Sequence, residues 1–223
     1  MSYSGKVAVI TGGSKGIGRA TAEQFVALGA KVVINYSSDS AAADEVVQKL
    51  GQDNVLSIKA DAGSVAGVKQ IVDETVARFG KIDILVPNAG WMPMANLEAV
   101  TEELFDQIYS INVKGPLTSL CHSANIVPPQ LLYVSTKGAI EQFTRLLSRD
   151  LAPKGIVVNC VAPGPTATEL FLRGKPDALV DAIKKQSPFN RLGTPEEIAE
   201  AIVFMSGTSW VAGQTLKANG SLI

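Results

Sequence analysis

The residues best placed to do chemistry are Tyr133 and Lys137, which are four positions apart in a predicted helix. Side chains at positions i and i+4 lie on the same helical face. A lysine ammonium beside a phenol favours the phenolate, and this would let Tyr133 donate or accept a proton near neutral pH. Because the same spacing occurs by chance in many helices, its meaning depends on two motifs that come before it.

The first of these motifs is a glycine-rich run, Thr11-Gly12-Gly13-Ser14-Lys15-Gly16-Ile17-Gly18. It follows the first predicted strand and opens the first predicted helix. Glycines let the backbone approach a pyrophosphate, and the helix N-terminus offers unpaired N–H groups and a positive dipole end. The run therefore predicts a dinucleotide site, and the alternative is a plain tight turn.

The end of the second predicted strand bears on which nicotinamide cofactor binds. It reads Asn35-Tyr36-Ser37-Ser38, without the acid that would accept hydrogen bonds from the ribose hydroxyls of NAD. A lysine and hydroxyl groups suit a 2′-phosphate, so Lys15 and Ser37 favour NADP(H). Two alternatives stay open: Asp39 could serve NAD, although it lies beyond the expected strand end, and Lys15 could be a solvated surface charge.

The second motif, Asn88-Ala89-Gly90, follows the fourth predicted strand. Small residues at the carboxyl end of a parallel strand leave room for a cofactor, although Asn and Gly are also common in turns. Asp61, after the third strand, has two similar interpretations. It could accept from an adenine amino group, or it could be a turn residue before a helix cap at Ser64.

Composition restricts the class of protein. The chain has 223 residues, of which 46% are hydrophobic and 18% charged, as expected for one globular domain over residues 1–223. A net charge of −1 argues against a nucleic-acid partner. Cys121 and Cys160 have no CxxC spacing, which argues against a disulfide framework or a zinc site. Without a predicted signal peptide or membrane span, we expect a cytoplasmic protein.

Strands and helices alternate along most of the chain. The predicted strands are Val7–Ile10, Lys31–Asn35, Val55–Lys59, Ile82–Val86, Ile156–Val161 and Thr215–Ala218. The predicted helices are Ile17–Leu28, Ser40–Leu50 with Ser40 as N-cap, Ser64–Phe79, Thr101–Val113 with Thr101 as N-cap, Tyr133–Leu151, Ala178–Lys185 and Glu196–Met205. Repeated βα units predict an α/β fold, a single Rossmann-like doubly wound parallel sheet with helices on both faces.

One stretch breaks this alternation. One helix is predicted before residues 113–132 and another after them, and no β-branched apolar run lies between the two helices. A regular doubly wound sheet would place a strand here.

Together these motifs are similar to those of the classical short-chain dehydrogenase/reductase (SDR) family. The glycine run matches TGxxxGxG, Asn88-Ala89-Gly90 matches NAG, and the tyrosine and lysine match YxxxK. Asn112 stands in the family's Asn-Val context, and Pro163-Gly164-Pro165 with Thr166 and Thr168 resembles the segment that meets the nicotinamide. Gly213-Gln214-Thr215-Leu216 also fits, so the resemblance covers nearly the whole chain.

The resemblance implies a division of labour in an NADP(H)-dependent oxidoreductase that acts on a carbonyl or secondary alcohol. Tyr133 would be the acid/base, Lys137 would hold the nicotinamide ribose, and Asn112 would support a water in a proton relay. A homodimer or homotetramer is implied, and no metal is needed. The residues expected to bind the cofactor are Gly12, Ser14, Lys15, Gly16, Ile17, Gly18, Asn35, Tyr36, Ser37, Asp61, Asn88, Ala89, Gly90, Tyr133, Lys137, Pro163, Gly164, Thr166 and Thr168.

The family also has a serine that binds the substrate carbonyl. Ser119 lies fourteen residues before Tyr133, at a spacing that fits the family, and is the candidate. Ser123 is the fallback, and a third interpretation is that neither is correctly placed.

Relative to the family, the chain is short by roughly twenty residues, which we place between Leu117 and Thr118. The missing part corresponds to the end of one helix and most of the fifth strand. Residues omitted from the sequence, an alternative splice product and a real deletion all remain open as causes. A real deletion would force the fourth strand to pair with Ile156–Val161 or loosen the fold. The alternative function is therefore a catalytically impaired homologue that binds nucleotide or acts as an interaction protein.

A few further residues have two interpretations each. His122 is more typical of a loop at the pocket rim than of a metal site or general base. Trp91, Met92 and Met94 either line a pocket for a partly apolar ketone or cover the sheet edge. We expect Cys160 in the core and Trp210 in packing.

Overall fold

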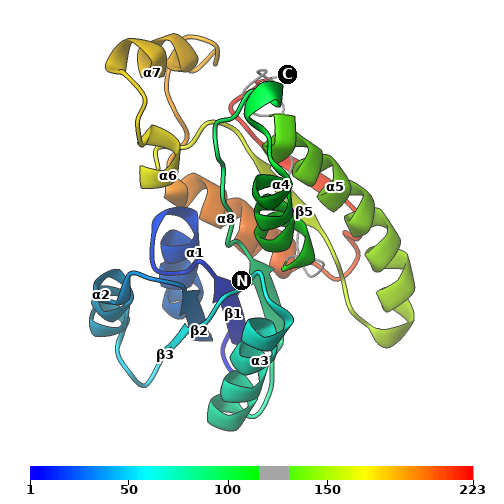
Figure 1. Cartoon of the computed structure of the whole chain (residues 1–223). Helices are drawn as coiled ribbons and strands as arrows, with labels where there is room; N and C mark the ends of the chain where they lie inside the picture. Colours follow the sequence, from blue (N-terminus) through cyan, green and yellow to red (C-terminus); the bar gives the residue numbers. More distant parts are fainter. Residues whose placement is uncertain (116–130, 223) are drawn as a thin grey trace.

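The strands form two parallel sheets (Figure 1) in a computed structural model that describes residues 1–115 and 131–222. The first sheet has the order β3-β2-β1-β4 and contains β1 (Val7–Thr11), β2 (Lys31–Tyr36), β3 (Val55–Lys59) and β4 (Ile84–Pro87). The second pairs β5 (Cys160–Pro163) with β6 (Thr215–Ala218). Parallel pairing with helical crossovers is the Rossmann-like α/β architecture that the alternation predicts.

The helices connect these strands. They are α1 (Gly16–Ala27), α2 (Ser40–Leu50), α3 (Val65–Phe79), α4 (Glu102–Tyr109), α5 (Leu131–Leu151), α6 (Glu169–Leu172), α7 (Asp177–Lys184) and α8 (Pro195–Ser206). Short 3₁₀ segments occupy η1 (Leu97–Ala99) and η4 (Ala152–Lys154), and a π-helical segment, η2 (Ser110–Lys114), extends α4.

Alternate residues of the central strands pack against helices on opposite faces of the first sheet. Ile10 and Ile34 lie in a cluster with Phe25 of α1 and Val203 of α8. Val9 and Val33 pack on the other face, against Ile71 of α3. Burial on both faces is why β1 and β2 are continuous apolar runs in the sequence.

Most of the predicted elements are confirmed, and three details are wrong. Ser40 is not the cap of α2, because the Asp39 carboxylate accepts a hydrogen bond from the Ala42 amide at 3.0 Å. The fourth strand begins at Ile84 and not at Ile82. In the predicted strand Ile156–Val161, only Cys160 and Val161 are in β5, which continues to Pro163, because pairing with β6 begins at Cys160.

The two sheets are not joined through β4 and β5. Among the described residues, no strand lies between these two, and no ladder pairs them. Of the two outcomes expected of a real deletion, re-closure of the sheet by pairing the fourth strand with Ile156–Val161 is therefore excluded, and a loosened fold remains. Consistent with an open edge, Leu85 in β4 is 44% exposed, whereas β1 is buried throughout. The Leu117–Thr118 junction lies outside the described residues.

Two predictions about single side chains have opposite outcomes. Cys160 is buried in β5, which confirms its expected place in the core. Trp210 is 95% exposed, so the prediction that it serves packing is wrong. The sequence around Trp210 does not distinguish a buried indole from an exposed one. In the part of the chain that the structure describes, no helix is both long enough and apolar enough to span a bilayer.

Candidate active site

The glycine-rich loop and the turn after β4 are held together by hydrogen bonds. The Asn88 side-chain amide donates to the carbonyls of Thr11 and Gly12, at 3.0 and 3.1 Å. The Thr11 hydroxyl in turn accepts from the backbone amides of Asn88 and Ala89, both at 3.0 Å. Thr11, which opens the predicted motif, was not predicted as a site residue, yet it positions both loops.

The same contact explains why the loop needs glycine. Gly12 has a φ of +62°, and a Cβ there would lie 3.0 Å from the Ala89 Cα. At Gly18 a Cβ would lie 2.3 Å from the Gly12 carbonyl oxygen. The loop therefore presents bare backbone beside the start of α1 at Gly16, and this combination fits the pyrophosphate of a dinucleotide.

Tyr133 and Lys137 lie on one face of α5, as their spacing predicts. The Lys137 ammonium is 5.1 Å from the centroid of the Tyr133 ring, within the range of a cation–π contact. Both side chains are half-buried. They are accessible enough to meet a ligand and are fixed by a helix of 21 residues.

Asn112 links this helix to the turn after β4. Its side chain is fully buried in the π-helical segment. Its oxygen accepts from the Trp91 amide and its nitrogen donates to the Trp91 carbonyl, both at 2.8 Å. A third contact, to the Thr136 hydroxyl, is 3.4 Å long. Asn112 therefore holds the segment after Gly90 against α5, a positioning role that its family context did not reveal.

The end of β2 combines a structural amide with a charged cluster. The Asn35 amide nitrogen donates to the carbonyls of Ile58 and Ala60, at 3.3 and 2.8 Å, and ties β2 to the end of β3. The Lys15 ammonium is 2.8 Å from Asp39 and 2.9 Å from Glu169. Lys15 is therefore exposed but paired, and Glu169 is a residue that the sequence did not single out.

Several other predicted site residues have structural roles. The Asp61 carboxylate accepts from the Gly63 amide at 2.8 Å, and Ser64 caps α3, which supports the turn interpretation of Asp61. Thr166 is buried, and its hydroxyl donates to the Gly164 carbonyl at 2.9 Å. Thr168 caps the short helix α6. Thr166 and Thr168 therefore shape the segment that follows Pro163.

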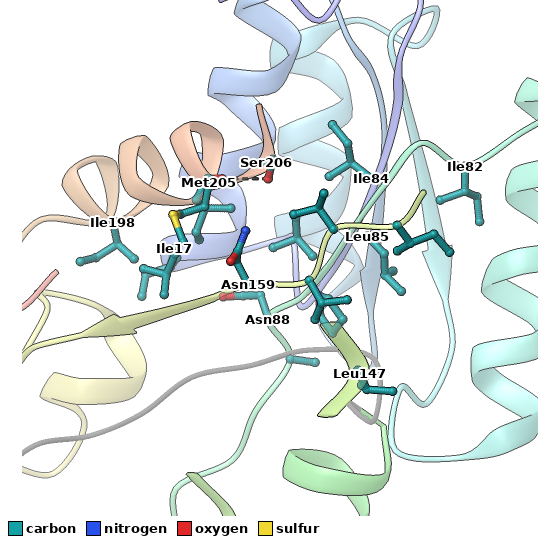
Figure 2. A pocket seen from close by; sticks show the side chains of 18 of the residues that line it. Ile17, Ile82, Ile84, Leu85, Asn88, Leu147, Asn159, Ile198, Met205 and Ser206 are labelled. Carbon is teal, nitrogen blue, oxygen red and sulfur yellow. Dashed lines mark hydrogen bonds between the residues drawn. The ribbon is translucent and has the colours of Figure 1, made fainter. Parts of the chain in front are cut away.

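A cavity of about 500 Å³ lies between β4 and β5. Figure 2 shows apolar side chains around it, including Leu85 of β4 and Leu147 of α5, with Asn88 and Asn159 among them. Asn112, Lys137 and Pro163 also line it, so the cavity reaches the candidate active site. It occupies the place where the alternation of the sequence predicts a further strand.

The two candidate substrate-binding serines and the single histidine cannot be placed in the site. Ser119, Ser123 and His122 all lie outside the described residues. Within residues 1–115 and 131–222, no group of three or more His, Cys, Asp or Glu residues is arranged to hold a metal.

Comparison with known proteins decides the family. Residues 6–126 match the family model described as short chain dehydrogenase, and residues 117–221 match the model described as Enoyl-(Acyl carrier protein) reductase. A short-chain type dehydrogenase/reductase of Picea abies is 36% identical over an alignment that covers 98% of this chain and 93% of the relative. The chain belongs to the short-chain dehydrogenase/reductase family.

Solved structures of other family members agree. A short chain dehydrogenase of Burkholderia cenocepacia J2315, in complex with NADP, has a TM-score of 0.91 at 30% identity and covers 100% of this chain and 99% of its own. The angucycline C-6 ketoreductase LanV, with bound NADP, has a TM-score of 0.90 at 31% identity and covers 99% and 96%. The fold and the oxidoreductase class are therefore those of the family.

The alignment with the Picea abies relative also bears on length. It runs over 251 residues, whereas this chain has 223. The relative therefore has residues without a counterpart here. The position of the shortfall between Leu117 and Thr118 stays a prediction.

Proposed function

We propose that this protein is an NADP(H)-dependent carbonyl reductase or alcohol dehydrogenase that acts on a medium-sized, partly apolar ketone or its alcohol. The observation that carries the proposal is the Tyr133–Lys137 pair on α5, of which Lys137 lines the cavity together with Asn112 and the turn after β4. The two solved relatives bound to NADP support the cofactor, and the ketoreductase among them supports the substrate class.

The residues divide the work as follows. The nicotinamide supplies or takes a hydride when the cofactor is bound. Tyr133 donates a proton to the carbonyl oxygen in reduction, or takes one in oxidation. Lys137 contacts the Tyr133 ring and would bind the nicotinamide ribose. Asn112 fixes the Trp91 backbone that borders the site, and the glycine loop binds the pyrophosphate.

The remaining cofactor contacts follow the sequence predictions. Gly12, Ser14, Gly16, Ile17 and Gly18 would surround the phosphates, and Ala89 and Gly90 would leave room beside them. Pro163, Gly164, Thr166 and Thr168 would border the nicotinamide. Tyr36, Ser37 and Lys15 would face the adenosine end. A cytoplasmic homodimer or homotetramer is part of the same proposal.

Replacing the proton donor tests this mechanism. In Tyr133→Phe we expect turnover of a ketone to fall by roughly 10²–10⁴-fold, the usual contribution of general acid/base catalysis. NADPH binding, measured separately by fluorescence titration, should be nearly unchanged because only the hydroxyl is removed. Lys137→Ala should reduce both turnover and binding. Turnover near the wild-type rate in Tyr133→Phe would refute the mechanism.

Titration with both cofactors tests the preference. NADPH should bind more tightly than NADH, because losing one charged contact to the 2′-phosphate costs on the order of 1.5–3 kcal/mol. Equal affinities, or tighter binding of NADH, would refute the roles of Lys15 and Ser37.

The open edge between β4 and β5 favours a second candidate, a homologue that binds nucleotide without efficient catalysis. Among the described residues, β4 pairs only with β1, and no strand on its other edge positions a substrate-binding serine. A protein that binds NADPH but turns over no member of a ketone panel would support this alternative. Measurable turnover would favour the enzyme, and an intact mass well above 23.4 kDa would show that the natural chain is longer.

A further inference from the structure

Lys15 is the meeting point of three segments that are far apart in the sequence. It lies in the glycine loop, Asp39 lies at the start of α2, and Glu169 is the first residue of α6. Its ammonium is 2.8 Å from a carboxylate oxygen of Asp39 and 2.9 Å from one of Glu169. One cation is thus shared by two carboxylates from segments far apart in the sequence.

The two carboxylates differ in how they are held. Asp39 also caps α2 through the Ala42 amide, so it is fixed where it stands. Glu169 belongs to a helix of four residues, is 52% exposed and has a second cation, Arg173, within contact distance at 2.6 Å. Glu169 can therefore leave Lys15 and remain paired, whereas Asp39 cannot move without uncapping α2.

The contact between Glu169 and Lys15 also brings α6 against the glycine loop. A Cβ on Gly16 would lie only 3.2 Å from the Thr168 Cγ2. The segment that begins at Pro163, and that is expected to border the nicotinamide, therefore rests on the loop that is expected to bind the pyrophosphate. The ion pair between Lys15 and Glu169 is the charged part of this contact.

We propose that Glu169 is a specificity-determining residue whose carboxylate competes with the 2′-phosphate of NADPH for Lys15. This inference rests on the proposed function, since it assigns Lys15 to the 2′-phosphate. When the phosphate binds, Glu169 turns to Arg173 alone, and the contact between α6 and the glycine loop loses its charged link. NADH, which has no phosphate at this position, leaves the ion pair intact.

Electrostatics supports the competition. The hydrogen bond from Lys15 is the largest cause that lowers the pKa of Glu169, and it also lowers the pKa of Asp39. Both groups are therefore fully ionised at neutral pH and repel a phosphate dianion. Removing either charge should leave Lys15 more available to the phosphate.

The test is the affinity of Glu169→Gln for each cofactor, measured by equilibrium fluorescence titration. We expect NADPH to bind about threefold to fivefold more tightly than to wild type, the size expected for one exposed ion pair. NADH affinity should change less than twofold. The gain for NADPH should shrink in 0.5 M NaCl because exposed charges are screened.

Two controls and one further variant show where the effect arises. Asp73→Asn removes the same charge from an exposed pair with Lys69 on α3 and should change neither affinity. Glu169→Gln should have no effect on NADPH in a Lys15→Gln background. Asp39→Asn, which keeps a capping side chain, should also tighten NADPH binding if its fold is intact by circular dichroism.

Contrary results would separate this inference from the proposed function. Unchanged NADPH affinity in Glu169→Gln, an equal gain for NADH, or a gain that persists without Lys15 would overturn the inference and leave the proposed function standing. A wild-type protein that binds neither cofactor would overturn both.

Discussion

Replacing Asn112 with alanine should destabilise the protein before it affects any chemistry. The side chain is fully buried and makes two hydrogen bonds of 2.8 Å to the Trp91 backbone. Truncation leaves both Trp91 groups without these partners, at about 1–3 kcal/mol for each buried group. Because Trp91 is only half-buried and water can reach it, we expect about 2–4 kcal/mol in total.

Such a loss is a large part of the ~5–15 kcal/mol of a typical domain. At roughly 2–4 °C per kcal/mol for a chain of this size, Tm should fall by about 4–16 °C. Urea denaturation followed by far-UV circular dichroism gives the free energy of unfolding directly. Asn96→Ala is the matched control, since Asn96 is exposed and makes no capping hydrogen bond. It should stay within about 0.5 kcal/mol of wild type.

The result that would refute this reasoning is a change below about 0.5 kcal/mol in Asn112→Ala. If turnover fell while stability did not, the role of Asn112 would be in proton transfer alone, and the contact with Trp91 would have no structural weight.

Three further changes test other parts of the structure. Gly18→Ala should cost about 1–3 kcal/mol and weaken NADPH binding, because its Cβ would lie 2.3 Å from a backbone oxygen of the glycine loop; Gly138→Ala, where a Cβ meets nothing within 4 Å, should instead be tolerated. Leu85→Lys should lower the free energy of unfolding by less than about 1 kcal/mol, because its side chain borders the open cavity. Val33→Lys, at a fully buried position, should instead prevent folding. Equal destabilisation by both substitutions would show that the cavity is filled. A neighbouring arginine and a backbone amide lower the pKa of Glu197 from 4.5 to about 2. Its ionised carboxylate therefore contributes stability above pH 4.5, and this contribution is lost as the pH falls towards 2. Glu197→Gln should therefore be slightly less stable than wild type at pH 7, and a difference that failed to shrink between pH 4.5 and 3 in urea denaturation would contradict this.

The sequence predicts the elements well where local rules decide them. β1 and β2 are apolar runs bounded by polar residues, and the structure buries them on both faces. The caps at Ser64 and Thr101 are confirmed because a side-chain oxygen followed by a helical segment is a local signal. Ser40 was a wrong cap because Asp39, one residue earlier, is an equally good one.

Features that depend on partners distant in sequence could not be predicted. Residues 156–159 have the composition of a strand, but an isolated β-type run becomes a strand only where a neighbour pairs with it. The pairing of Lys15 with Glu169 joins residues 154 positions apart, and no spacing rule reports it. The hydrogen bonds between Asn112 and Trp91 likewise join residues 21 positions apart, and no spacing rule predicts them.

The break between the two sheets gives α8 a particular importance. Val203 of this helix packs in the core of the first sheet, and its backbone carbonyl accepts a 2.6 Å hydrogen bond from Tyr3. Ile198 and Met205, on the same helix, pack with Val161 of the second sheet. Among the described residues, the two sheets are thus linked through side chains of α8, together with Ile17 of α1, and not through a continuous ladder. Because α8 also packs along α1, a substitution that loosens this helix should destabilise both sheets and the start of the glycine-loop helix together.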